Sequence, residues 1–124
     1  LEAGIRGETA EIPQNQTMDF EYVYCCDVGR AVDLAATIPM PDQTIMNIGT
    51  GRITPFEELV AIAQEVLPKL KVEIIPGQPP AISSKQPLEI SRAKKYLEWK
   101  PTYDMRSGLC EYINDLEIVM KTNK

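Results

Sequence analysis

The sequence predicts an α/β fold, a small partial domain of about three short strands and four helices. Two observations lead to this prediction. Segments of alternating, β-branched and aromatic residues are followed by segments whose apolar residues recur at helical spacing, and prolines, glycines and serines separate them. The predicted order is strand, helix, strand, helix, strand, helix, helix. Three strands are too few for a complete doubly wound sheet, so we expect only part of such a domain.

The first strand and helix are predicted in residues 19–38. In DFEYVYC, residues 19–25, aromatic side chains alternate with other residues, which is typical of a strand. Asp27 suits the N-cap of a helix, because its short carboxylate can accept a hydrogen bond from the first turn. Apolar residues then fall at helical spacing, and Pro39 and Pro41 end the predicted helix.

The middle of the chain is predicted to repeat this order. TIMNIG, residues 44–49, is a second short strand candidate. An apolar stripe over residues 56–67 predicts a helix that Pro68 stops. KVEIIP, residues 71–76, is the third strand candidate, and GQPPAISSKQP, residues 77–87, has the composition of an irregular surface loop.

Two helices are expected at the C-terminal end. A short one covers residues 91–97, and Asp104 caps a longer one. The apolar stripe of that last helix consists of Met105, Leu109, Tyr112, Ile113, Leu116 and Met120. Leu1 and Ile5 are also one helical turn apart, as if a helix were already under way at the first residue, so we expect a chain that is a piece of a longer polypeptide.

Composition narrows the class of protein. The 124 residues carry a net charge of −5 with a pI near 4.8, which provides no electrostatic attraction to nucleic acid or to an anionic membrane. No apolar run approaches the roughly 18–20 residues of a membrane span, and the first residues do not have the pattern of a signal peptide. We therefore expect a cytoplasmic protein that binds neither nucleic acid nor membrane.

The cysteines and the missing histidine limit the chemistry. Cys25 and Cys26 are adjacent, Cys110 stands alone, and no C-x-x-C occurs. We expect reduced cysteines that are packed as small apolar residues. The chain has no histidine, which excludes Cys/His zinc sites and Ser-His-Asp triads within it. The sequence indicates no metal site.

NIGTGRITPFEEL, residues 47–59, resembles a cofactor loop at first sight. A dinucleotide-binding loop needs a third glycine where Thr54 stands, and a phosphate-binding P-loop needs a Gly-Lys-Ser/Thr ending. The favoured interpretation is a tight turn at Gly49 and Gly51, followed by a capping box with Thr54 at the N-cap and Glu57 reaching back. A weaker alternative is an anion site at the helix N-terminus, beside Arg52.

Tyr96 and Lys100 form a second motif, the Y-x-x-x-K of short-chain dehydrogenases. The pair acts only when one helix places both side chains on one face. Lys100 precedes Pro101, which disfavours helical geometry at that residue. We interpret the motif as a coincidence and expect Tyr96 and Trp99 to be core residues.

Three segments together resemble the extended short-chain dehydrogenase/reductases, the NAD-dependent epimerase/dehydratase family. They are DFEYVYCCDVGRAVDLA at 19–35, IMNIGTGRITPFEELV at 45–60, and PGQPPAISSKQPLEISRAKKYLEWKPTYDMRSGL at 76–109. They occur in the family's order and spacing, and the resemblance runs from about Leu1 to Leu116. It identifies residues 1–124 as a single C-terminal substrate-binding domain of such a protein.

The resemblance implies a longer parent protein of sugar metabolism, an isomerase, lyase or oxidoreductase. Its N-terminal Rossmann domain would bind NAD or NADP and carry the catalytic Tyr and Lys. This chain lacks that domain, so we expect it to bind no cofactor and to have no catalytic residues of its own. We expect it to contact the missing domain, to bind a small-molecule substrate, and to form a homo-oligomer through exposed apolar surface.

The resemblance also suggests substrate contacts. Loops 14–18, 49–53 and 76–86 would face the active-site cleft, with Met18, Arg52 and Gln78 as the candidate contacts. Met18 and Gln78 replace two arginines that hold a diphosphate in many members of the family. A substrate without a nucleotide, such as a sugar, a sugar acid or another small hydroxy compound, is therefore at least an equal alternative to a sugar nucleotide.

Two other positions depart from the family pattern. Glu98 replaces a glycine before Trp99, so we expect a different turn there. Glu89 replaces an aspartate at a helix cap, which is a milder change. The rival hypothesis for the whole chain is a stand-alone, non-enzymatic α/β module for binding or dimerisation.

Overall fold

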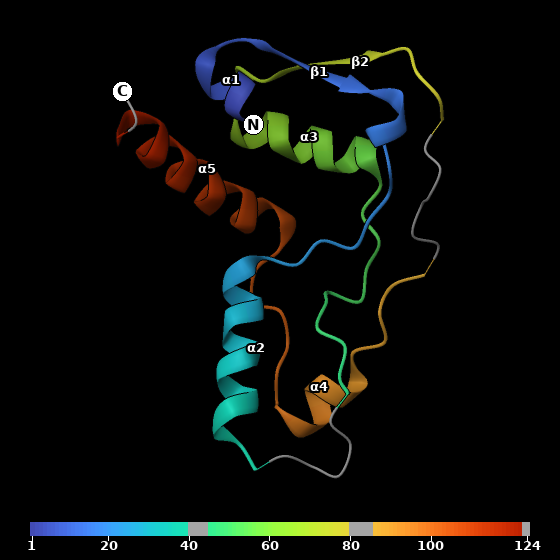
Figure 1. Ribbon diagram of the computed structural model, residues 1–124, viewed down its shortest axis with the longest axis vertical. Helices are drawn as coiled ribbons and strands as arrows, with labels where there is room; N and C mark the ends of the chain where they lie inside the picture. Colours follow the sequence, from blue (N-terminus) through green and yellow to red (C-terminus); the bar gives the residue numbers. More distant parts are fainter. Residues whose placement is uncertain (40–44, 80–85, 123–124) are drawn as a thin grey trace.

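The computed structural model describes residues 1–39, 45–79 and 86–122. Within these ranges the chain forms five α-helices, a short 3-10 helix and a parallel sheet of two strands. Figure 1 shows the sheet with α1, α3 and α5 at one end of the molecule and α2 and α4 at the other. Pro41, Thr44 and residues 80–85, to which we assigned a helix end, a strand start and part of a loop, lie outside the described residues.

The sheet joins two segments that are far apart in the sequence. Strand β1 (Thr9–Pro13) follows helix α1 (Glu2–Arg6) and pairs in parallel with β2 (Lys71–Ile75). The 3-10 helix η1 (Gln14–Gln16) follows β1 directly. Strand β2 was predicted, whereas β1 was missed because five residues with a glutamate and a terminal proline give only a weak strand pattern.

Helices α3 and α5 pack against each other below the sheet (Figure 1). Helix α3 (Phe56–Val66) ends before Pro68, as predicted, and buries Phe56 and Ala63. Helix α5 (Met105–Thr122) buries Gly108 and Ile113. The apolar stripes in the sequence thus located both helices correctly, although Tyr112 of the α5 stripe is 48% exposed.

A hydrophobic core cluster lies between helices α2 (Cys25–Thr37) and α4 (Ser91–Tyr96). Its buried residues are Ala31, Ala93, Leu97 and Trp99. The Trp99 side chain is fully buried, and its Nε1–H donates a hydrogen bond to the Asp27 carbonyl at 3.0 Å. Trp99 is a core residue, as predicted, and Tyr96 is half-buried.

Two predicted strands are absent. Residues 19–24 and 45–49 form no ladder within the described residues, and 19–24 makes only an isolated antiparallel bridge between Phe20 and Thr54. The fold therefore has two described strands instead of about three, and five helices instead of four. An alternating pattern favours extended backbone, but a strand also needs a neighbour with which to exchange hydrogen bonds.

Asp27 is not an N-cap. It is the third residue of α2, and Tyr24 occupies the N-cap position. The predicted capping box at α3 is also wrong, because Pro55 is the N-cap residue and Thr54 makes no capping hydrogen bond. Instead the Phe56 N–H donates to Asp19 Oδ1 at 2.9 Å, so the first turn is capped by a residue from a distant segment.

Two other predicted caps are confirmed. Ser107 N–H donates to Asp104 Oδ1 at 2.7 Å, and the Asp104 N–H donates back to Ser107 Oγ at 3.0 Å. Glu89 accepts from the Ser91 N–H at 2.8 Å at the start of α4. These hydrogen bonds lower the pKa of both carboxylates, because they stabilise the charged form.

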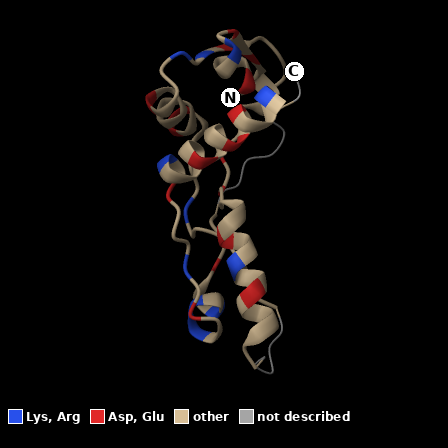
Figure 2. Ribbon diagram, turned by 90° about the vertical axis from the view of Figure 1, so that its left-hand side faces the viewer, with Lys and Arg blue, Asp and Glu red and all other residues tan. Residues whose placement is uncertain are grey.

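Basic and acidic side chains are concentrated on different helices. Basic residues gather on α4 and acidic residues on α3 (Figure 2). Arg92, Lys94 and Lys95 are exposed, in agreement with a solvated face. None of the described helices has the length and apolar character needed to cross a membrane.

Candidate functional site

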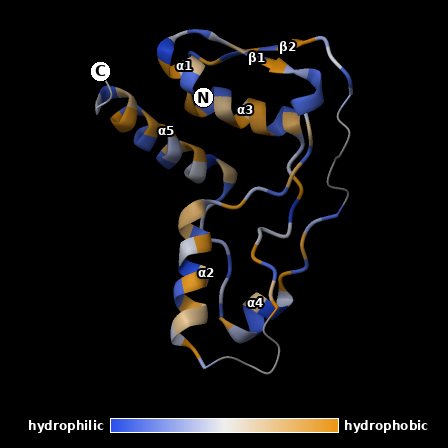
Figure 3. Ribbon diagram, in the orientation of Figure 1, coloured by the Kyte–Doolittle hydropathy of each residue, from blue (hydrophilic) through white to orange (hydrophobic). Residues whose placement is uncertain are grey.

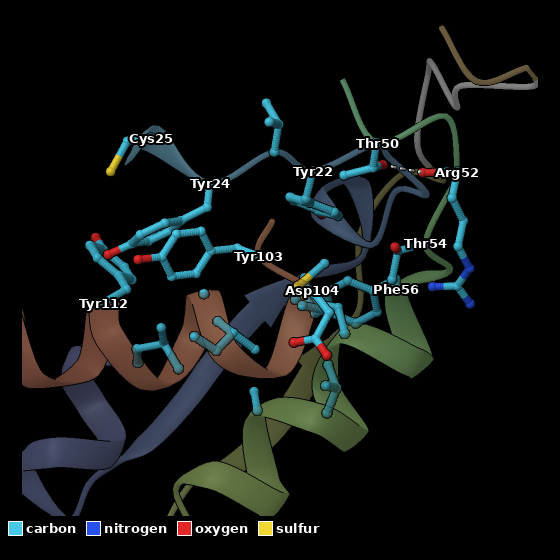
Figure 4. A pocket seen from close by; sticks show the side chains of 18 of the residues that line it. Tyr22, Tyr24, Cys25, Thr50, Arg52, Thr54, Phe56, Tyr103, Asp104 and Tyr112 are labelled. Carbon is cyan, nitrogen blue, oxygen red and sulfur yellow. Dashed lines mark hydrogen bonds between the residues drawn. The ribbon is translucent and has the colours of Figure 1, made fainter. Parts of the chain in front are cut away.

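An apolar groove of about 670 Å³ lies between the sheet, α3, α5 and residues 22–25. Its size is that of a typical small-molecule site. Aromatic side chains line much of it, and Figure 4 shows them around a common space. They are Tyr22, Tyr24, Phe56, Tyr103 and Tyr112. Aliphatic residues of β1, β2 and α3 form other parts of the wall.

Arg52 lies at the border of this groove, with Thr50 and Tyr22 (Figure 4). Its guanidinium donates to both carboxylate oxygens of Glu58, at 2.8 and 2.6 Å, which raises the pKa of Arg52. The charge of Arg52 is therefore balanced within the chain. This ion pair is largely exposed, so it contributes little to stability.

The N-terminus of α3 does not offer the open anion site that was the weaker alternative for this region. The Asp19 carboxylate already accepts the hydrogen bond of the Phe56 N–H, and Glu57 and Glu58 add negative charge in the first turn. An incoming anion would meet three carboxylates there. This correction could not come from the local sequence, since Asp19 lies 37 positions before Phe56.

The glycine turn between residues 47 and 52 encloses a carboxylate of the protein itself. Glu21 Oε1 accepts from the Gly51 N–H at 2.7 Å, and Oε2 accepts from the Leu88 N–H at 2.6 Å. Gly51 has a φ of 74°, and a Cβ on Gly49 would come within 2.3 Å of Glu21 Oε1. The interpretation as a structural turn is confirmed. No motif in the sequence indicated the role of Glu21.

Met18 and Gln78 lie outside the groove, near the carboxyl ends of the two parallel strands. The register pairs Pro13 with Ile75, so the segments that follow β1 and β2 leave the same edge of the sheet. Accordingly, a Cβ on Gly77 would lie 3.9 Å from Gln14 Cβ. Met18 is half-buried and Gln78 is exposed.

The three candidate substrate contacts thus do not all line the groove. Arg52 lines the groove, whereas Met18 and Gln78 do not. The bridge between Phe20 and Thr54 brings the segment that contains Met18 alongside the segment that contains Arg52. Ligands of open α/β sheets commonly bind at the carboxyl ends of parallel strands, so this edge and the adjoining groove form the candidate site.

The cysteines are exposed, which corrects the expectation that they are packed in the core. Cys25 and Cys26 begin α2, and Cys25 lines the groove. Burial raises the pKa of Tyr24 to about 12, with a further contribution from the two neighbouring thiols. In residues 1–39, 45–79 and 86–122, no three His, Cys, Asp or Glu side chains come together to hold a metal ion.

Tyr96 and Lys100 do not form a catalytic pair. Helix α4 ends at Tyr96, so Lys100 lies beyond it. The Lys100 carbonyl accepts a hydrogen bond from Arg30 of α2. The interpretation of Y-x-x-x-K as a coincidence is confirmed by this geometry.

Sequence comparison finds related proteins, although no family model matches the chain. UDP-glucuronic acid decarboxylase 6 of Arabidopsis thaliana is 30% identical over 109 residues, which are 85% of this chain and 30% of that protein. UDP-glucuronic acid decarboxylase 5 of the same plant is 27% identical over 124 residues, 97% of this chain and 35% of that protein.

Solved structures share the fold. UDP-glucose 4-epimerase of Thermotoga maritima, crystallised with UDP-glucose, superposes with a TM-score of 0.73 at 32% identity, over 93% of this chain and 38% of that one. MoeE5 in complex with UDP-glucose and NAD gives a TM-score of 0.75 at 23% identity, over 96% of this chain and 40% of that one.

The chain is similar in sequence and in fold to sugar-nucleotide enzymes of the short-chain dehydrogenase/reductase class. More narrowly, the chain is related to the NAD-dependent epimerase/dehydratase family, as the sequence motifs predicted. It spans about a third of the length of the relatives it matches, 30% and 35% for the two plant decarboxylases.

Proposed function

We propose that the chain is the substrate-binding portion of an NAD(P)-dependent sugar epimerase, dehydratase or dehydrogenase, and that it is not catalytic on its own. The observation that carries this proposal is the extent of the similarity. Matches cover 85% of this chain or more, yet only 30–40% of proteins that act on or bind UDP-sugars. The sequence contains neither a complete G-x-G-x-x-G loop nor a Y-x-x-x-K on one helix.

The sheet edge suits a hydroxyl-rich ligand. Neutral amides are concentrated there, and each amide group both donates and accepts hydrogen bonds, as sugar hydroxyls require. These exposed residues are Gln14, Asn15, Gln16 and Gln78. Together with Arg52 they favour a sugar or sugar acid, with or without a nucleotide. In the parent protein the cofactor, NAD or NADP, would be held by the Rossmann domain that this chain lacks.

Calorimetric titration of the purified chain tests the proposal. We expect no binding of NAD⁺ or NADH and weak binding of UDP-glucuronic acid or glucuronic acid. Gln78→Ala should reduce that binding, whereas Asn114→Ala, an exposed amide on α5, should not. Micromolar binding of NAD⁺ would contradict the proposal that the cofactor site lies elsewhere.

The alternative is a stand-alone, non-enzymatic module for binding or dimerisation. Its support is the apolar surface exposed on α2 and α5 (Figure 3), where Val32 is 64% and Ile118 is 62% exposed. Such surface favours self-association. The coding sequence before Leu1 distinguishes the two: a glycine-rich βαβ unit with Y-x-x-x-K supports the enzyme portion, and an immediately preceding Met codon supports the module.

A further inference from the structure

The parallel sheet has an open edge along β2. The two strands pair from Thr9 with Lys71 to Pro13 with Ile75. Among the described residues, no backbone hydrogen bond joins residues 71–75 to any segment except β1. A strand in a parallel pair directs about half of its N–H and C=O groups toward its neighbour and the others outward. The outward groups of β2 are therefore free to pair with a further strand.

The two faces of this sheet differ in polarity. Ala10 and Ile12 of β1 and Val72 of β2 line the apolar groove. Because successive side chains of a strand point to opposite faces, Lys71 and Glu73 lie on the other face of the sheet. Both of these charged side chains are exposed. The charges of β2 are thus on the solvent face, beside the open edge.

Two carboxylates lie side by side on the solvent face. The register places Glu11 of β1 next to Glu73 of β2, and both side chains are exposed. Side chains in register on neighbouring strands are about 5 Å apart, so like charges there repel each other. In the part of the chain that the structure describes, neither glutamate nor Lys71 takes part in an ion pair. A cation on the open side of Glu73 would relieve this repulsion.

We infer that the open edge of β2 binds β2 of a second copy of this chain, antiparallel and with the twofold axis at Val72. A twofold axis perpendicular to a sheet makes equivalent edge strands antiparallel. Only registers that pair residues of the same face keep the solvent face continuous. In the register centred on Val72, Lys71 of one protomer lies opposite the partner's Glu73, and symmetry repeats this pair. Each carboxylate pair thereby gains a neighbouring cation.

The edge of β1 does not offer the same contact. Strand β1 carries Glu11 but no cation, and it ends in Pro13, which has no N–H to donate. A lysine at a sheet edge commonly keeps copies of a protein apart. In β2, however, Glu73 follows Lys71 at a spacing of two, so the symmetric register turns these charges into complementary pairs.

The proposed contact is small, since β2 has five residues. Stable interfaces bury about 800 Å² on each partner, which one pair of short strands does not reach. We therefore expect a weak, reversible dimer that forms at high protein concentration. The contact involves neither substrate nor cofactor, so this inference can fail without affecting the proposed function.

Sedimentation equilibrium of the purified chain over a range of concentrations tests the inference. We expect a monomer–dimer equilibrium that added salt weakens, because the ion pairs are exposed. Lys71→Glu and Glu73→Lys should each weaken dimerisation about tenfold or more, since like charges then face each other twice in the symmetric contact. The double variant Lys71→Glu/Glu73→Lys exchanges the charges and should restore dimerisation. Circular dichroism checks that each variant is folded.

A matched control and a second measurement locate the contact. Lys94→Glu makes the same charge change on α4, at the other end of the molecule (Figure 1), and should dimerise as the unsubstituted chain does. Amide hydrogen exchange should slow in residues 71–75 at high concentration and stay unchanged in residues 9–13. A chain that is monomeric at every concentration, tighter association of Lys71→Glu, or a double variant as weak as the single ones would overturn the inference.

Discussion

The buried carboxylate of Asp27 in α2 accepts both the backbone N–H and the hydroxyl of Thr102, 75 positions further along the chain. The N–H lies 3.0 and 2.9 Å from the two carboxylate oxygens, and the hydroxyl lies 2.7 Å from Oδ1. Tyr103 N–H and the Arg30 guanidinium complete the set of donors. Asp27 thus connects α2 to the segment that leads into α5.

Replacing Asp27 with Asn should destabilise the fold by about 3 kcal/mol. Asn keeps the shape of the side chain but loses the charge and places an NH₂ group where only acceptors fit, which leaves buried donors without partners. Urea unfolding measured by circular dichroism gives the free energy of unfolding. Asp33→Asn, at an exposed position of the same helix, is the control and should change it by less than about 0.5 kcal/mol. Equal effects of the two variants would contradict the role of Asp27.

The free energy of unfolding should be constant between about pH 5 and 8 and should decrease in acid. The chain has no histidine to titrate in that range. Burial alone would raise the pKa of Asp27, but hydrogen bonds from Arg30, Tyr103 and Thr102 outweigh it and lower the pKa.

A carboxylate whose pKa is lowered by folding stabilises the protein fully above its unfolded pKa, near 4. That contribution is lost as the pH falls from the unfolded pKa through the lower pKa of the folded state. The same holds for Glu89 and Asp104, whose pKa values folding also lowers. Urea unfolding at a series of pH values measures this. In Asp27→Asn the acid-dependent decrease should be smaller. A decrease that is equally steep in the variant would mean that Asp27 does not contribute to it.

Asp19→Ala should destabilise α3 by about 1 kcal/mol, the usual contribution of a helix cap. The reason is the hydrogen bond from the Phe56 N–H to Asp19 Oδ1. Hydrogen exchange of the Phe56 amide should accelerate in this variant. Thr54→Val, which removes the hydroxyl of the predicted capping box, should leave that amide's protection unchanged. If exchange accelerated in Thr54→Val and not in Asp19→Ala, Thr54 rather than Asp19 would be the residue that caps α3.

Glu98→Gly should stabilise the protein. Glu98 has a φ of 51°, in the left-handed region that costs a residue with a Cβ about 1–2 kcal/mol. Glycine avoids this cost but makes the unfolded chain more flexible, which removes about 0.4–1 kcal/mol of the gain. We expect a net increase of about 0.5–1 kcal/mol in the free energy of unfolding by urea. Glu98→Ala retains a Cβ and should show no such increase.

The glutamate at position 98 also shows where a resemblance is informative. The family pattern has a glycine before Trp99, and the expectation from the sequence was a different turn. The backbone at Glu98 adopts a left-handed conformation, which glycine would accept without strain, and a turn different from that of the family stays a prediction. The Trp99 N–H, directly after this turn, donates to the Ala93 carbonyl at 3.2 Å, so the turn also helps place the indole in the core.

Helix positions and the similarity to known proteins were predictable from the sequence. The apolar stripes of α3 and α5 and the caps at Glu89 and Asp104 depend on residues a few positions apart, and such local patterns are readable without the fold. The motifs around the glycine turn predicted a relation that the decarboxylases and the epimerase confirm. Local order in the sequence determined these features.

Only the tertiary structure decided which segments form strands, which distant residues cap the helices and which residues line the groove. Residues 19–24 and 45–49 have strand-like sequences, but strand formation depends on a partner that no local pattern specifies. Asp19 caps a helix 37 residues away, and Asp27 binds a backbone segment 75 residues away. Such contacts join carboxylates to donors that only folding brings within hydrogen-bond distance, so the sequence showed the residue types but not their partners.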